Sequence, residues 1–322
     1  MIVLKPPSQA TAITFLSLLF LFLFLLILIT PISVSSQVLT HPLNNKTNSG
    51  KNATASTSTS NSLAVVRLSA DKFGIKKIYP TNIGGREWFI NMANPKNDSL
   101  FSVGDISHQN ITRESDGSWH ISYPKVRMEV TTPPGSALWK NVEITGYVKV
   151  NSIIPHDHNN NANYTDIAWL ARSGRHSDSS RCDGTALIGG IHDDGTVGWK
   201  KEIWFTGGYT KELAQSKPAN SIVGKWIGWK VVMYNIDNNT AVKMESYLDY
   251  NNNNHWVKVT DILDDGGWFA DATDGEFYSA NCGRAKDYIL ANGGPNVTFR
   301  SDNLAMDFKD LSVREIRPPT DR

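Results

Sequence analysis

Hydrophobic and polar residues alternate along much of the chain after residue 85, which is the pattern of half-buried β-strands. The clearest run is 138–150, LWKNVEITGYVKV, in which Val142, Ile144 and Val148 fall on one face. Trp139 and Tyr147 fall on the other face, among polar residues. Because successive side chains of a strand point to opposite faces of a sheet, we predict an antiparallel strand with one apolar face and one mixed face.

The segment 224–236, GKWIGWKVVMYNI, divides in the same way, and the turn sequence IDNNT joins it to 241–250, AVKMESYLDY. These two runs predict a β-hairpin. Further strands are predicted at 87–90, at 119–131, within 251–262, as three runs within 167–209, and as two runs within 296–316. About a dozen strands separated by short turns favour an all-β fold of two antiparallel sheets packed as a sandwich.

The first 62 residues differ in composition from the rest of the chain. Residues 12–29, AITFLSLLFLFLFLLILI, are apolar or small without interruption, so 1–36 is predicted to be a signal peptide or an N-terminal membrane anchor. Residues 37–62 are rich in Ser, Thr and Asn and predict a low-complexity linker. We therefore expect a β-sandwich domain at 63–322 in a protein that is secreted or displayed at the cell surface.

The charge and cysteine content narrow the choice of partners. Lys and Arg number 32 against 31 Asp and Glu, so nothing in the balance points to nucleic acid, and membrane contact is expected only through the N-terminal segment. An even count of cysteines in an exported chain predicts one disulfide, Cys182 with Cys282, with two free thiols as the alternative. The ten Trp and ten Tyr suit sugar-binding surfaces, where a flat ring packs on a pyranose.

Three of these segments together resemble the concanavalin A-like lectin/glucanase superfamily: WKNVEITGYVKV, GKWIGWKVVMYNI with the following VKMESYLD, and the closing MDFKDLSVREI. The resemblance covers roughly residues 85–317 and is one of strand pattern. It implies a jelly roll of two curved antiparallel sheets with carbohydrate lying across the concave sheet. It also implies a ligand for a structural calcium ion at Asp307 on the last strand.

A second, weaker resemblance is to alginate lyase-like polysaccharide lyases. The segments LARSGR at 170–175 and GIH at 190–192 are similar to two of that family's strands, although the first lacks the family's Glu and the second has Gly in place of Gln. The resemblance implies Arg172, His192 and Tyr288 as catalytic residues. An arginine would neutralise a uronate carboxylate, and a Tyr or His would move the protons of a β-elimination.

The mixed faces of the strands supply the candidate carbohydrate contacts. They are Arg175, Lys200, Glu202, Trp204, Tyr209, Trp226, Lys230, Tyr234, Glu245 and Tyr247. Each also has an ordinary interpretation, as sheet covering or as a cross-strand pair. Three functions stay open at this point: a domain that binds a polysaccharide or cell-surface glycan, a lyase that cleaves an acidic glycan, and a structural surface domain.

Overall fold

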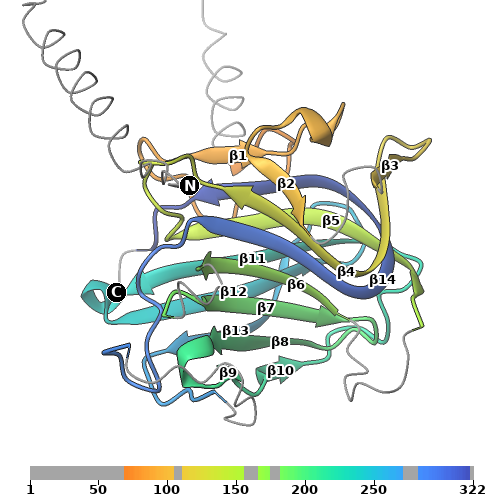
Figure 1. Cartoon of the computed structure of the whole chain (residues 1–322). Helices are drawn as coiled ribbons and strands as arrows, with labels where there is room; N and C mark the ends of the chain where they lie inside the picture. The colour runs from red at the N-terminus through yellow and green to blue at the C-terminus, as the bar shows by residue number, and fades with distance from the viewer. Residues whose placement is uncertain (1–68, 105–110, 156–165, 175–181, 271–281, 320–322) are drawn as a thin grey trace, which may run out of the picture. The chain divides into compact units, whose positions relative to one another are not determined.

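The computed structural model describes residues 69–104, 111–155, 166–174, 182–270 and 282–319. The predictions for 1–62 and the candidate Arg175 lie outside these ranges. The regular elements of the described chain are mostly strands (Figure 1). In chain order the elements are β1 (Glu87–Phe89), η2 (Pro95–Asn97), β2 (Phe101–Gly104), β3 (Ile111–Arg113), β4 (Trp119–Thr131), β5 (Val142–Ile153), β6 (Asp166–Ser173), β7 (Thr185–His192), β8 (Val197–Ile203), η4 (Trp204–Thr206), β9 (Gly208–Tyr209), β10 (Leu213–Ser216), β11 (Trp226–Ile236), η5 (Asp237–Asn239), β12 (Ala241–Asp249), β13 (Val257–Asp264) and β14 (Asn296–Glu315).

The described strands form one curled sheet in the order β10-β8-β7-β6-β14-β5-β11-β12-β13, and the named strand pairs are antiparallel. Strand β4 pairs with the opposite edge of β14 and carries β2 and β3, while β1 pairs with the end of β14. The sheet curls until its two halves face each other, as in a β-sandwich. The all-β antiparallel prediction is therefore confirmed, whereas the jelly-roll strand order stays a prediction.

The predicted hairpin at 224–250 is present as β11 and β12, and its turn explains why the sequence there is so rich in Asn. Asp237, Asn238 and Asn239 all have positive φ angles, of 48°, 55° and 69°. Asn and Asp adopt this left-handed conformation more readily than other residues that carry a Cβ. The local sequence therefore determines the turn, and the turn sets the register of the two strands.

The closing segment differs from its prediction, because 296–316 contains one bent strand where two were expected. Strand β14 pairs with β6 over Asn296–Asp302 and with β5 over Leu304–Glu315. Asn303 and Asp310 have positive φ angles, of 55° and 56°, and interrupt the extended backbone without ending the strand. The turn-like residues of this segment thus bend a continuous strand that passes from one half of the sheet to the other.

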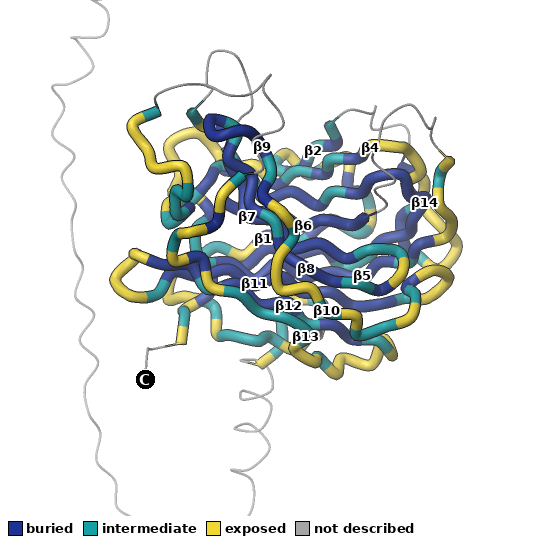
Figure 2. The backbone as a smooth tube through the Cα atoms, turned by 90° about the horizontal axis from the view of Figure 1, so that it is seen from below, coloured by how far each residue is buried: buried dark blue, intermediate teal, exposed yellow. Residues whose placement is uncertain are grey.

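Buried stretches of the strands line the space between the two facing halves, where the core lies (Figure 2). Aliphatic side chains make up most of this core, and a group of aromatic rings packs at its centre. The ring centroids of Trp169 on β6 and Trp229 on β11 are 4.6 Å apart, and Phe299 on β14 lies 5.2 Å from Trp169. All three side chains are at most 1% exposed. Trp229 Nε1 donates to Ser246 Oγ at 2.8 Å, so its polar group is satisfied inside the core.

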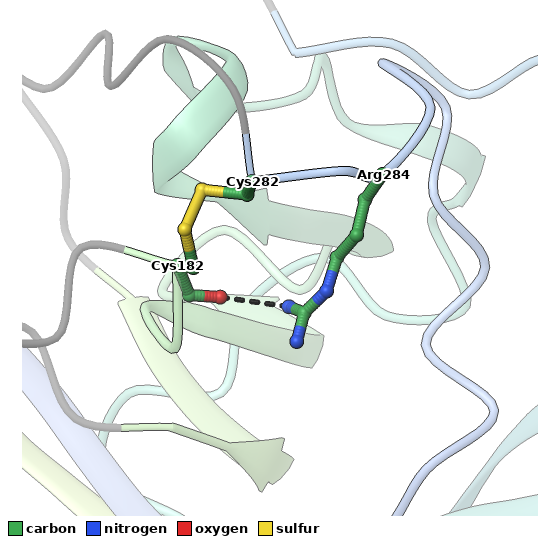
Figure 3. The surroundings of a disulfide bond; sticks show 3 residues. All are labelled: Cys182, Cys282 and Arg284. Carbon is green, nitrogen blue, oxygen red and sulfur yellow. Dashed lines mark hydrogen bonds between the residues drawn. A yellow bond between two sulfur atoms is a disulfide. The ribbon is translucent and has the colours of Figure 1, made fainter.

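The predicted disulfide is confirmed. Cys182 and Cys282 are bonded, with their Cα atoms 5.5 Å apart, and join the segment after β6 to the segment before β14 (Figure 3). As for membrane contact, none of the helical turns in the described residues has the length and apolar character needed to cross a bilayer.

Replacing Trp169 with Ala should lower the free energy of unfolding by about 3–5 kcal/mol, because it removes the ring that joins β6 to β11 and leaves a cavity between the layers. Denaturant titration followed by circular dichroism measures the change. Tyr123→Ala is the matched control, since Tyr123 is 41% exposed and should cost under about 1 kcal/mol. Equal effects of the two substitutions would contradict this account of the core.

Candidate functional site

A groove of about 740 Å³ lies on the outer face of the half-sheet that contains β4, β14, β6 and β8. We call it the outer groove. It is lined by Gly104, Lys125, Arg127, Glu129, Thr131, Leu170, Ser173, Gly174, Glu202, Trp204, Tyr209, Pro295, Asn296, Thr298 and Arg300. Three of the predicted carbohydrate contacts, on β8, η4 and β9, are brought together here.

Strand β8 directs its residues to two faces, as the alternation predicts. Trp199 and Lys201 are fully buried on the core side, where Lys201 Nζ lies 2.9 Å from the Asp264 carboxylate. Glu202 and Trp204 belong to the outer groove, and Trp204 Nε1 donates a hydrogen bond to the Glu202 carboxylate. The Tyr209 ring meets the Trp204 ring edge-on, with centroids 6.2 Å apart. The two rings form an aromatic wall at this end of the groove.

Arg300 on β14 crosses from the opposite wall toward Tyr209. Its Nε donates to the Asp302 carboxylate at 2.5 Å and its Nη1 to the Tyr209 hydroxyl at 3.4 Å. Arg127 on β4 donates to the other oxygen of Asp302 at 3.1 Å. Burial opposes the charge of Arg300, but Asp302 and Tyr209 outweigh it and raise the pKa of Arg300 above its usual value. One carboxylate thus holds two arginines in place beside the aromatic wall.

A group of acids and bases lies beside the groove at the far end of β6 and β7. His192 Nε2 lies 3.1 Å from the Glu212 carboxylate, and Asp166 is paired with His192 across the strands. Burial raises the pKa of Asp166 to about 7, with Asp302 adding to the rise and Arg300 and His192 opposing it. The Asp166 side chain therefore keeps its proton up to neutral pH.

The same region contains Lys200, whose pKa is lowered to about 8, mainly by burial and further by Arg300, while Glu212 opposes the change. Two glycines make room for Glu212 on the sheet: Gly190 and Gly198 pair across β7 and β8, and a Cβ on Gly198 would lie 2.5 Å from a Glu212 carboxylate oxygen. Charged groups of both signs therefore meet beside the groove.

The three residues that the lyase resemblance implies as catalytic are not brought together. Arg172 is 2% exposed and donates to the backbone oxygens of Leu290 and Lys140, at 2.6 and 2.9 Å. His192 is paired with Asp166, and Arg172 lies six residues further along β6. A strand rises about 3.3 Å per residue, so Arg172 and His192 are roughly 20 Å apart. Arg172 and Tyr288 share a different hollow, whereas His192 is at the other end of the strands.

The predicted contacts on β11 and β12 share one face, but that face is largely covered. Lys230 is 1% exposed and its Nζ lies 2.7 Å from the Glu143 carboxylate, while Tyr234 and Glu245 are 5% and 4% exposed. Tyr79, from the segment before β1, donates to Glu245 at 2.8 Å and closes this surface. The remaining two residues of that set, Trp226 and Tyr247, are half-buried at its edges.

The surroundings of Asp307 do not fit a calcium ion. Its carboxylate lies 2.8 Å from Lys149 Nζ and 2.8 Å from His120 Nδ1, and Asn151 donates to it at 2.7 Å. Among the described carboxylate, histidine and cysteine side chains, Glu114 joins His120 and Asp307 in a group whose potential ligand atoms lie within 4.8 Å of one another. Calcium takes about six to eight oxygen ligands, whereas this carboxylate is already neutralised by an ammonium group and contacts a histidine nitrogen.

Sequence reasoning missed the residues that β4 and β14 contribute to the groove. Val297 and Phe299 are in the core, so Thr298 and Arg300 point outward, and Arg127 and Glu129 do the same on β4. The alternation in NVTFRSD and VRMEV contains this signal. It does not show that β14 lies beside β6, and this adjacency is what brings Arg300 to Tyr209.

Comparison of the sequence with protein-family models found no match, and comparison with curated proteins found none. Similar solved structures include a Bacillus subtilis protein described as having a galectin-like fold (10% identity, 75% of this chain and 100% of that chain, TM-score 0.43). Others are basic winged bean lectin with Tn-antigen (9%, 71% and 97%, 0.41) and the exoplasmic/lumenal domain of VIP36 in a form bound to Ca²⁺ and Man3GlcNAc (9%, 69% and 89%, 0.39). Identities and TM-scores this low assign no function to this chain.

Replacing Asp166 with Asn should stabilise the protein more at pH 8 than at pH 4. In the folded chain Asp166 holds its proton to about pH 7, whereas in the unfolded chain it ionises near its ordinary value of 3.8. The folded state of the natural protein therefore loses stability as the pH rises between these values, by up to about 1.4 kcal/mol per unit, and the loss is constant above them. Asn removes that loss.

Denaturant titrations of both proteins from pH 4 to 8 measure the difference. Asp194→Asn is a control of opposite sign, because a hydrogen bond from Lys217 lowers the pKa of Asp194 to about 2. A stability gain in Asp166→Asn that does not change with pH would contradict the assignment.

Proposed function

We propose that this chain binds a polysaccharide in the outer groove. One observation carries the proposal: the aromatic wall of Trp204 and Tyr209 lies in the same groove as the hydrogen-bonding groups of Arg300 and Glu202. An aromatic ring packs on the apolar face of a sugar ring, while charged and amide groups bind its hydroxyls. The lining of the groove comes from β4, β14, β6 and β8, and a site that extends across several strands suits a chain better than a compact small molecule.

We infer that the protein works outside the reducing cytosol, as a secreted or surface protein. The disulfide between Cys182 and Cys282 supports this, because disulfides persist in oxidising compartments. The apolar segment 12–29, expected to be a signal peptide or an anchor, is consistent with the same location.

Trp204→Ala should weaken retention on a bound polysaccharide roughly ten-fold, since it removes the larger ring of the wall. Affinity electrophoresis of the full chain through gels containing neutral or uronic acid polysaccharides measures the effect. Trp226→Ala is the rival variant, because Trp226 belongs to the face formed by β11. If Trp226→Ala abolishes retention and Trp204→Ala does not, the binding face is the other one and the outer groove is not the site.

A second candidate function is β-elimination in the same groove, and the contact between Arg300 and Tyr209 favours it. Arg300 would neutralise a uronate carboxylate, which acidifies the proton on the adjacent carbon. The Glu202 carboxylate, which lines the same groove, would accept that proton as the bond to the leaving oxygen breaks and a carbon–carbon double bond forms. Burial raises the pKa of Tyr209, so its phenol stays protonated and suits protonation of the leaving oxygen.

Under this second candidate function, uronic acid polysaccharides should yield an unsaturated product that absorbs in the ultraviolet, and Tyr209→Phe should abolish its formation while preserving retention in the gel. Tyr123→Phe, in contrast, should leave the rate within about two-fold, since Tyr123 is 41% exposed and does not line the groove. A flat absorbance trace from the natural protein with retention intact would leave binding alone as the function.

A further inference from the structure

A second hollow of about 280 Å³ adjoins the outer groove, and the two share Ser173, Gly174 and Pro295 in their walls. We call it the end cavity. Its polar lining comes from Arg172, Ser173, Asp183, Thr185, Arg284, Tyr288 and Asn292. Because both hollows open at the end of β6, a chain lying in the groove would continue into the end cavity.

The end cavity carries more positive than negative charge. Two arginines, Arg172 and Arg284, line it with one carboxylate, Asp183, which is exposed at its edge. Within the described ranges the hydrogen bonds of both guanidinium groups go to backbone carbonyls, and neither arginine forms an ion pair. In this part of the chain, each arginine therefore lacks a carboxylate in direct ion-pair contact.

Arg172 is the more costly of the two, because its charge is buried. Its Nε is a buried donor with no partner in the described structure, and the neighbouring Ser173 Oγ is also buried and unpartnered. Burial lowers the pKa of Arg172 to about 9, and Asp264 opposes this only in part. A buried charge that is not neutralised destabilises the fold, so an anion entering the cavity would be bound favourably.

Arg284 is fixed at the rim of the cavity by the disulfide. Its Nη1 donates to the Cys182 carbonyl at 2.7 Å, and Cys182 is bonded to Cys282, two residues before Arg284 (Figure 3). Its guanidinium also lies 4.8 Å from the centroid of the Tyr288 ring. The guanidinium is thus held in one place, and Asn292, which donates to the Tyr288 hydroxyl at 3.1 Å, adds neutral groups for sugar hydroxyls.

We propose that the end cavity is an anion subsite, which binds the acidic substituent of one sugar, a carboxylate or a sulfate, while the neighbouring sugars lie in the outer groove. This inference rests on the proposed polysaccharide binding and names the class of polysaccharide as acidic. Arginine suits the role because its planar fork matches both carboxylate and sulfate oxygens.

The test is isothermal titration of the full chain with an oligogalacturonate, with its carboxyl-reduced neutral counterpart, and with a sulfated galactan oligosaccharide. The natural protein should bind at least one acidic oligosaccharide roughly ten-fold more tightly than the neutral one. Comparison of the two acidic ligands shows whether the subsite takes a carboxylate or a sulfate.

Arg284→Gln should weaken binding of the preferred acidic oligosaccharide by roughly ten-fold and leave the neutral one unchanged. Arg284 is exposed, so its replacement should not disturb folding. Lys286→Gln is the matched control: it removes one exposed positive charge from the same segment, outside the lining of the cavity, and should change binding less than about two-fold.

Three results would overturn the inference, and they are distinguishable. If the neutral and acidic oligosaccharides bind equally and Arg284→Gln changes nothing, the anion subsite is wrong while polysaccharide binding stands. If no oligosaccharide and no polysaccharide of the panel binds, both proposals fail. Equal losses from Arg284→Gln and Lys286→Gln would show a general charge effect and would also overturn the subsite.

Discussion

The pairing of β14 with two different neighbours along one edge is the constraint on which the rest of the structure depends. Its first part is hydrogen-bonded to β6 and its second part to β5, so one strand holds both halves of the curled sheet. The bends at Asn303 and Asp310 allow this passage. The aromatic core then forms where the halves meet, because Trp169 on β6 is brought opposite Trp229 on β11.

The two outer faces of the sheet use charge in different ways. On the half formed by β5 and β11, the Glu143 carboxylate forms ion pairs with Lys230 Nζ at 2.7 Å and with Arg314 Nη2 at 2.6 Å. All three side chains are at most 1% exposed. Such pairs are closed to ligands and costly to break, since removal of one partner leaves a buried charge. On the half formed by β6 and β8, Arg300 and Arg127 are held by Asp302 but still line an open groove.

The outer groove and the end cavity meet at Ser173 and Gly174, where β6 ends. The disulfide acts on the same place, because Cys182 fixes Arg284 at the rim. Under the proposals above, a bound polysaccharide would meet aromatic rings in the outer groove and arginines in the end cavity. This difference between the two ends would favour one orientation of the bound chain. An acidic polysaccharide would supply the negative charge that pairs with these arginines.

The sequence by itself determined the strands and their faces. Alternation assigned Trp229 and Val231 to the core and Glu202 and Trp204 to the outer surface. The even cysteine count favoured the disulfide over two free thiols, and the structure contains it. These are local or compositional properties, because a strand's faces follow from its own residues. A resemblance in strand pattern correctly implied an all-β fold. The weaker lyase resemblance implied a catalytic group of three residues, of which the structure brings Arg172 and Tyr288 into one hollow and leaves His192 at the other end of the strands.

Only the tertiary structure decided which strands are neighbours, and the candidate site depends on that. Arg300 meets Tyr209 across 91 residues of sequence, and this contact needs β14 beside β6. Similarly, Lys230 has the alternation of a surface residue but is buried, with its Nζ 2.7 Å from the Glu143 carboxylate and 4.4 Å from the centroid of the Trp256 ring. The physical reason is that strand order, and the segments that cover a sheet, are set by the burial of apolar faces from distant parts of the chain. The pattern within one strand does not show which other strand will bury its face.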